Sequence, residues 1–219
     1  TAEKEAEMKS IENNEGEVEK RKDMRNTLTF TIDPEDAKDF DDAISFSELN
    51  DNLFEVGVHI ADVSYFVKED TELDREAKSR ATSVYLVDRV IPMLPETLSN
   101  NLCSLRPNED KLTFSAIFKV NKKGDIKEEW FGKTVIKSNE RLSYQEAKHL
   151  IDSGSTKIPK EVSLDNKEKK VEEKLTKALS VTNEIAQNIR KKRISTGAII
   201  FDKTEIKFEL DENKHPIEI

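Results

Sequence analysis

The chain has 219 residues and a formal net charge of −9, and 37% of its residues are charged while 35% are apolar. That length can bury a substantial core, and the apolar fraction is too high for a chain that is disordered throughout. We expect no membrane span and no signal peptide, and the single cysteine, Cys103, excludes an internal disulfide framework and suits a reducing cytoplasm.

The two ends of the chain suggest a piece of a longer polypeptide. Residue 1 is threonine rather than methionine, and residues 215–219 resemble the start of a strand. Residues 1–26 are almost all charged or polar and predict a charged linker or a solvated helix. The net negative charge would ordinarily argue against a nucleic-acid partner, but that argument weakens if basic parts of the parent lie outside this chain.

The first half of the chain predicts strands with one helix among them. Apolar runs indicate strands at 28–32, 43–49 and 53–61. Thr71 and Asp74 fit the capping positions of a helix N-terminus, so we expect a helix from Thr71 to about Val84 that delivers Tyr85 to its end. Two prolines then force an extended segment, and a short helical turn or loop follows it, at 91–95 and 98–105.

The second half predicts further strands and two helices. The strands are expected at 112–120, 126–136, 198–201 and 205–210. Ser143 and Glu146 form a capping box that opens a helix, which Gly154 should end. Apolar residues at three- and four-residue spacing predict a long amphipathic helix from Val171 to about Lys192. The pattern indicates an α+β fold, in which a mixed, mainly antiparallel, curved sheet is flanked by helices.

The stretch 31–44 has the most unusual chemistry, because six of its fourteen residues are carboxylates and only one is a lysine. Convergent carboxylates repel each other, and the usual reason to collect them is a hard divalent cation. A helix–loop–helix calcium site does not fit, since Lys38 and Ile44 stand where that loop needs glycine and glutamate, counting from Asp33. An acidic surface loop of turns and caps remains an alternative.

Two details favour a site. Asp39, Asp41 and Asp42 cannot all point the same way in a strand, so they would surround a point from two sides. Asp33, at a strand end, could close the ring. Such an oxygen-only set suits Mg²⁺ or Mn²⁺, and two ions roughly 4 Å apart would clamp a phosphate from both sides.

These residues closely resemble the catalytic domain of the ribonuclease II / ribonuclease R family, called the RNB domain, and they resemble the ribonuclease R branch most. The resemblance rests on five segments in the same order: 31–33 with 39–43, then 59–62, Tyr85, 91–95 and 98–105. It implies that residues 27–219 form the N-terminal part of such a domain.

The resemblance implies a processive hydrolytic exoribonuclease that degrades single-stranded RNA from the 3′ end and releases nucleoside 5′-monophosphates. Asp33, Asp39, Asp41 and Asp42 match the four active-site aspartates that bind Mg²⁺ or Mn²⁺, with Asp42 the one most directly engaged in cleavage. Tyr85 matches the tyrosine that stacks on the 3′-terminal base, a contact worth ~1–3 kcal/mol.

Other residues are weaker candidates. Arg106 could contact RNA phosphates, and so could Arg190 and Arg193, although a basic cluster at a helix C-terminus is equally explained by the helix dipole. His59 on an apolar strand is expected to be a core or hydrogen-bonding residue rather than a catalyst. Asp62 could support the site indirectly or simply form a turn.

The resemblance also implies parts that this chain lacks. The family's catalytic domain continues with an arginine and a glutamate near the scissile phosphate, and OB-fold RNA-binding domains flank it. We therefore expect the chain alone to bind RNA poorly, to turn over little RNA, and to self-associate through uncovered apolar surface. The alternative function is a non-catalytic RNA-binding or protein-docking module, but a scaffold has no need to hold repelling carboxylates together.

Overall fold

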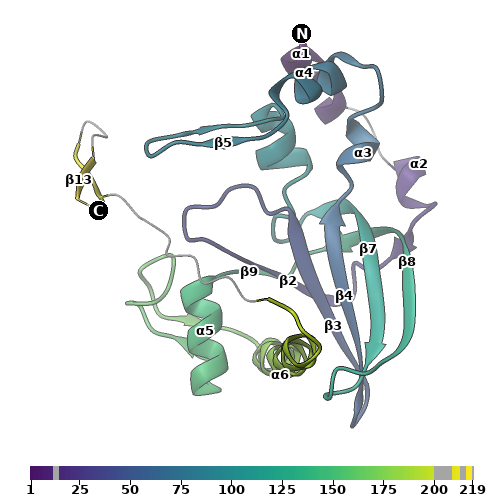
Figure 1. Ribbon diagram of the computed structural model, residues 1–219, viewed down its shortest axis with the longest axis vertical. Helices are drawn as coiled ribbons and strands as arrows, with labels where there is room; N and C mark the ends of the chain where they lie inside the picture. The colour runs from purple at the N-terminus through teal and green to yellow at the C-terminus, as the bar shows by residue number, and fades with distance from the viewer. Residues whose placement is uncertain (12–14, 200–208, 213–215, 219) are drawn as a thin grey trace.

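The computed structural model describes residues 1–11, 15–199, 209–212 and 216–218. Its centre is a seven-stranded sheet with the order β1-β8-β7-β4-β3-β2-β9 (Figure 1). These strands are β1 (Lys22–Asp23), β2 (Leu28–Asp33), β3 (Asp42–Asn50), β4 (Leu53–Ala61), β7 (Asp110–Val120), β8 (Ile126–Lys137) and β9 (Glu140–Ser143). The two edge pairs, β1–β8 and β2–β9, are parallel, and the pairs between them are antiparallel. The expected α+β fold is confirmed.

Helices pack against one face and one end of the sheet, and three small two-stranded sheets are separate from it. The helices are α1 (Ala2–Ile11), α2 (Glu15–Val18), α3 (Val63–Phe66), α4 (Glu72–Arg80), α5 (Tyr144–Ser153) and α6 (Glu173–Ser195), with a π-helical turn over Leu98–Leu102. The small two-stranded sheets pair β5 (Val84–Tyr85) with β6 (Val90–Ile91), β10 (Lys157–Ile158) with β11 (Lys169–Lys170), and β12 (Glu209–Leu210) with β13 (Pro216–Glu218).

Two apolar cores hold these layers together. One lies between the sheet and the helices α5 and α6, and it contains Phe30, Phe54 and Leu142. The other lies at the end of the sheet beside α1, α3 and α4, and it contains Phe40 and Leu98 (Figure 1). Fully burying a large aliphatic or aromatic side chain stabilises a fold by about 1.5–3 kcal/mol. Phe40 belongs to the acidic stretch, so the second core holds that stretch against the sheet.

The long amphipathic helix is confirmed, although it spans Glu173–Ser195 rather than the predicted range. Its buried residues include Leu175, Leu179 and Ile185, which recur along one face. The predicted capping box of α5 is also present: Ser143 Oγ accepts from the amide of Glu146 at 3.0 Å, and Glu146 Oε2 accepts from the amide of Ser143 at 2.9 Å.

The prediction of a helix from Thr71 to about Val84 was wrong for the C-terminal part of that range. Helix α4 begins after Thr71, whose side chain caps it as predicted, but it ends at Arg80, and Ala81 adopts a left-handed conformation with φ 64°. Threonine, serine and valine follow, which are weak helix formers, and the β6 strand offers a pairing partner. Tyr85 therefore lies in a β-hairpin and not at the end of a helix.

The N-terminal segment contacts the rest of the molecule. Helix α1 buries Ala2 and Ala6, and the amide of Leu73 on α4 donates to Glu5 Oε2 at 3.1 Å. Further on, β1 joins the sheet, and the buried guanidinium of Arg21 lies 2.7 Å from Asp62 Oδ2. The boundary between residues 26 and 27 stays a prediction.

The strands expected at the C-terminal end lie mostly outside the described residues. Of the range 205–210, only Glu209–Leu210 is described, as β12, and residues 198–199 are not in a strand. Within the described ranges, none of the helices combines the length and the apolar character needed to cross a membrane.

Candidate active site

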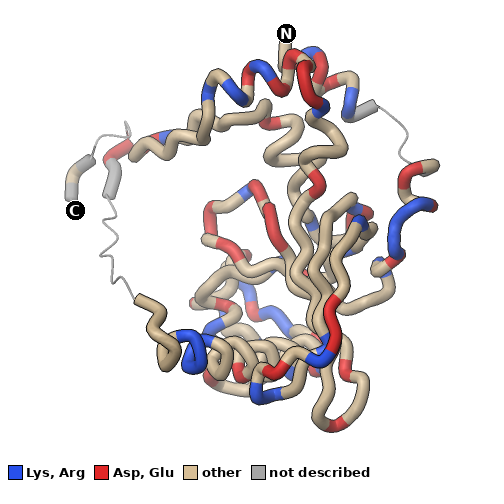
Figure 2. The backbone as a smooth tube through the Cα atoms, turned by 45° about the vertical axis from the view of Figure 1, so that its right-hand side comes forward, with Lys and Arg blue, Asp and Glu red and all other residues tan. Residues whose placement is uncertain are grey.

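The acidic stretch forms the connection between two paired strands. Asp33 ends β2 and Asp42 begins β3, and antiparallel pairing of these strands, for example Phe30 with Ile44, sets their ends side by side. Asp39 and Asp41 lie on the connecting loop, residues 34–41, which we call the acidic loop. Figure 2 shows the backbone of this loop, with its Asp and Glu positions in red, between the β5–β6 hairpin and the layer of α5 and α6 that Figure 1 labels. The sheet thus brings all four predicted aspartates to one end of two neighbouring strands.

The carboxylates influence one another. Asp33 is only 8% exposed, and burial raises its pKa, with the charges of Asp42 and Asp39 acting in the same direction and Arg141 opposing them. Burial also raises the pKa of Asp41, and the charges of Asp39, Asp42 and Asp33 add to the effect. Like charges that disfavour each other's ionised form must lie near one another. The charges of Asp39 and Asp42 therefore act on both Asp33 and Asp41.

The four aspartates do not form a finished metal site. Within the ranges that the structure describes, no three histidine, cysteine, aspartate or glutamate side chains are grouped so that they could hold a metal ion. The donor set nonetheless suits a hard divalent cation, because its ligand atoms are carboxylate oxygens and a cation would relieve their repulsion. The buried Oδ2 atom of Asp33 also has no hydrogen-bond partner among the described residues.

The acidic loop is anchored on one side by the segment that follows the π-helical turn. The amide of Phe40 donates to Ser104 Oγ at 3.1 Å, and Ser104 Oγ donates to the carbonyl of Lys38 at 2.8 Å. The amide of Leu105 donates to the carbonyl of Phe40 at 2.8 Å. Because Asp39 and Asp41 flank Phe40, these bonds fix the backbone that carries both carboxylates.

Arg141 anchors the acidic loop on its other side, and the sequence analysis did not identify it. Its Nη2 atom donates to three loop carbonyls, and its guanidinium lies 4.9 Å from the centre of the Phe40 ring. A single arginine in a short strand gives no recognisable signal. Only the pairing of Thr31 with Arg141 between β2 and β9 reveals its position.

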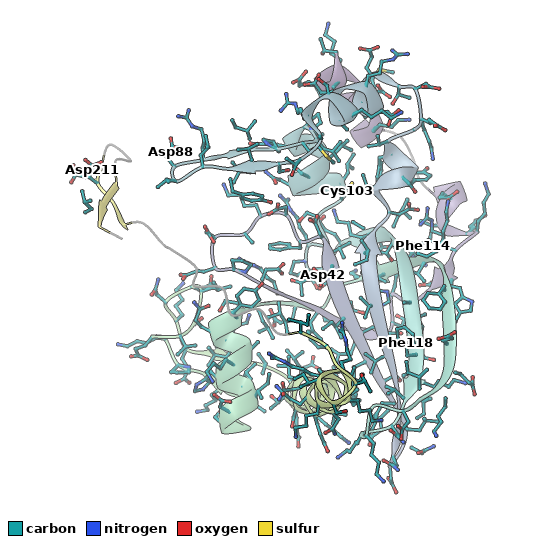
Figure 3. The ribbon with its side chains drawn as sticks, viewed as in Figure 1. Asp42, Asp88, Cys103, Phe114, Phe118 and Asp211 are labelled. Atoms are coloured by element: carbon teal, nitrogen blue, oxygen red, sulfur yellow. The ribbon has the colours of Figure 1, made fainter. Side chains whose placement is uncertain are left out.

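Tyr85 is 70% exposed on the β5–β6 hairpin. The neighbouring apolar side chains are exposed as well: Val84, Leu86, Val87, Val90 and Ile91. Figure 3 shows this hairpin reaching outward to Asp88 at its tip. The ring of Tyr85 is accessible to a flat apolar partner, but no contact within the described part of the chain joins it to the four aspartates.

The predicted arginines lie in two different places. Arg106 lines an open depression of about 460 Å³ beside the acidic loop, together with Lys38, Phe40 and Arg141. Arg190 and Arg193 are exposed in the last turns of α6. That end of α6 contacts the β7–β8 turn, where Lys192 lies 2.5 Å from Asp125 Oδ1, at the opposite end of the sheet from the aspartates (Figure 1). The structure thus brings Arg106 close to the acidic loop, but not the helix cluster.

His59 and Asp62 belong to the fold rather than to the acidic loop. His59 is fully buried, with Nδ1 2.6 Å from Ser115 Oγ, and burial lowers its pKa to about 4. The prediction of a core histidine is confirmed. Asp62 is also buried, where it accepts from Arg21 Nη2 and from Ser64 Oγ, each at 2.7 Å. Its contacts hold the N-terminal segment to the end of β4.

Comparison with known proteins adds to this picture. Residues 21–219 match the RNB domain. DIS3-like exonuclease 2 of Schizosaccharomyces pombe is 48% identical over 203 residues, which cover 91% of this chain and 22% of that protein. Ribonuclease R 2 of Lactococcus lactis is 43% identical over 215 residues, which cover 98% of this chain and 31% of that protein.

A solved structure has the same fold. It is that of Mycoplasma genitalium RNase R in complex with ribose methylated single-stranded RNA, which matches with a TM-score of 0.85 at 29% identity. The match covers 99% of this chain and 32% of that one. The chain therefore spans less than a third of the length of each of these three proteins.

Proposed function

Because the chain belongs to the RNB domain family, we propose that the whole protein is a processive 3′-to-5′ exoribonuclease. It hydrolyses single-stranded RNA and releases nucleoside 5′-monophosphates. The observation that carries this proposal is the anchored acidic loop, which places Asp39 and Asp41 between Asp33 at the end of β2 and Asp42 at the start of β3. Relatives named as an exonuclease and a ribonuclease, and a similar structure with bound single-stranded RNA, support it.

Asp33, Asp39, Asp41 and Asp42 are the residues that would hold Mg²⁺, or Mn²⁺ in its place. When bound, such a cation lowers the pKa of a water and neutralises charge on the phosphate. Asp33 supplies a buried, rigid carboxylate at the end of β2, whereas Asp42 is exposed at the start of β3. The resemblance to the family implies the most direct part in cleavage for Asp42, and its exposure and its pairing with Ile60 are compatible with that role.

Two further contacts would position the RNA. Tyr85 stacks on the 3′-terminal base, a contact that ignores base identity and so fits a sequence-tolerant nuclease. Arg106 contacts a backbone phosphate from the depression beside the acidic loop. Arg190 and Arg193 would act on RNA that extends further, since they lie at the other end of the sheet.

The chain alone would bind RNA poorly and turn over little of it, because it spans less than a third of its relatives. OB-fold domains flanking it would supply most of the RNA affinity, and the protein would act in the cytoplasm. The sheet also exposes apolar side chains through which the isolated chain would self-associate: Val58, Ile60, Phe114 and Phe131. Phe114 is labelled in Figure 3.

The second candidate function is a non-catalytic module that keeps the fold and binds RNA or protein. The observation in its favour is the lack of a finished metal-binding cluster among the described residues. Digestion of single-stranded RNA by the whole protein, with Mg²⁺ or with EDTA, separates the two functions. Release of nucleoside 5′-monophosphates that EDTA abolishes supports the nuclease, whereas binding without hydrolysis under both conditions supports the module.

A further inference from the structure

One arginine outside the acidic loop holds the first half of that loop. Arg141 lies in the middle of β9, and the parallel pairing of β9 with β2 aligns it with Thr31, two residues before Asp33. From there, Nη2 donates to the carbonyl of Pro34 at 3.1 Å, Glu35 at 2.7 Å and Ala37 at 3.3 Å. Three carbonyls within four residues of the loop thus lie around one nitrogen atom.

The same side chain also contacts the second half of the loop. Its guanidinium lies 4.9 Å from the centre of the Phe40 ring, and that ring is only 6% exposed. An arginine can donate to carbonyls and lie over an aromatic face at the same time, because its charge is spread over a planar group. Lysine carries a compact charge and cannot reproduce both contacts. Arg141 therefore joins residues 34–37 to Phe40, whose two neighbours in the chain are aspartates.

The hydrogen bonds of Arg141 are made with this backbone. In the part of the chain that the structure describes, its hydrogen bonds go to the loop carbonyls, and its Nε atom is buried without a hydrogen-bond partner. A surface arginine usually exchanges an ion pair for water at little cost. A guanidinium that instead donates to three main-chain carbonyls of one loop constrains the path of that loop, because all three must stay within reach of the same Nη2 atom.

We propose that Arg141 is a positioning residue of the active site, which shapes the acidic loop so that Asp39, Asp41 and Asp42 converge with Asp33. Its effect on catalysis rests on the proposed function, whereas its effect on the loop does not. Arg141→Lys keeps the charge and removes the planar contacts. Arg75→Lys is the matched control, because Arg75 is exposed on α4 and its ion pair is with Glu72 on the same helix.

The first experiment measures amide hydrogen exchange in the 219-residue chain. In Arg141→Lys, the hydrogen-bonded amides of Ala37 and Phe40 should exchange about tenfold faster or more, since charge-assisted bonds that close the loop are lost. Amides of β4 and β7 should be unchanged, and so should every amide in Arg75→Lys. Unchanged exchange in the acidic loop of Arg141→Lys would overturn the proposal. Faster exchange throughout the sheet would also overturn it, because the residue would then serve global stability alone.

The second experiment uses the whole protein and single-stranded RNA. Arg141→Lys should lower kcat about tenfold or more while KM for RNA changes little, and it should raise the Mg²⁺ concentration needed for half-maximal rate. An unchanged kcat, or a rise in KM alone, would refute a role in positioning the aspartates. If the unmodified whole protein shows no hydrolysis, the proposed function fails, and the exchange experiment still decides whether Arg141 holds the loop.

Discussion

Acidification should destabilise this fold through a single buried histidine. The ring of His59 is fully buried on β4, and its Nδ1 contacts Ser115 Oγ. Ser115 Oγ is hydrogen-bonded to Thr134 Oγ1, and Thr134 Oγ1 to Thr113 Oγ1, each at 2.5 Å. These hydroxyls carry no charge. A proton added to the ring would therefore place an uncompensated charge inside the sheet, and burial lowers the pKa of His59 from 6.5 to about 4.

The size of the effect follows from that shift in pKa. The unfolded chain binds the proton more readily than the folded one, so the stability is fully present above pH 6.5 and is lost as the pH falls towards the folded value. The complete loss is about 3 kcal/mol, of which about 2 kcal/mol is already gone at pH 5.

Urea unfolding of the unmodified chain and of His59→Gln, from roughly pH 7.5 to pH 5, isolates this contribution. As the pH falls over that range, the unmodified chain should lose about 2 kcal/mol of unfolding free energy relative to His59→Gln. A difference that stays constant would refute the reasoning. NMR titration of the His59 ring gives the answer independently of the variant, and a folded-state pKa near the ordinary value would refute it as well.

Three further outcomes are expected. Tyr85→Ala should weaken binding of 3′-terminal nucleotides by the whole protein roughly 5- to 150-fold in fluorescence anisotropy, without lowering Tm, because the ring is exposed; equal affinity would contradict the stacking role. Asp41→Asn should raise Tm of the metal-free chain in calorimetry at neutral pH. The folded-state pKa of Asp41 is raised, so ionisation of this carboxyl lowers stability as the pH rises from the ordinary aspartate pKa through the folded-state pKa. A lower Tm for the variant would contradict this. Gly57→Ala should destabilise the chain by about 1–3 kcal/mol in urea unfolding, because a Cβ there would lie 2.7 Å from His59 Nε2 and would also clash with Ser45; an unchanged midpoint would show that the ring moves freely.

Features whose causes are local in sequence could be predicted from it. The capping box at Ser143 and the cap at Thr71 need only residues three apart, and the buried face of α6 needs only a regular spacing. The end of α4 could not be predicted, because the segment around Tyr85 pairs with β6 instead of continuing the helix. The helix propensity of a segment depends on its own residues and contains no information about a strand elsewhere in the chain that can pair with it.

In the candidate site, too, some residues could be predicted from the sequence and others could not. The aspartates from Asp33 to Asp42 stand out by composition, and two paired strands bring them to one place. Their support does not stand out, because Ser104 and Arg141 lie far along the chain and meet the acidic loop only in the folded sheet; Arg141 is 107 residues from Pro34. The roles of the individual aspartates and arginines stay predictions.

The central claim, that the acidic loop carries the chemistry, is tested most directly by RNA digestion with the whole protein and its Asp42→Asn variant. Single strands labelled at the 5′ or the 3′ end are incubated with Mg²⁺ or with EDTA. We expect metal-dependent release of mononucleotides from the 3′ end, slowed about 100-fold or more in the variant while RNA binding persists. A variant as active as the unmodified protein, or RNA bound by both and hydrolysed by neither, would contradict the account.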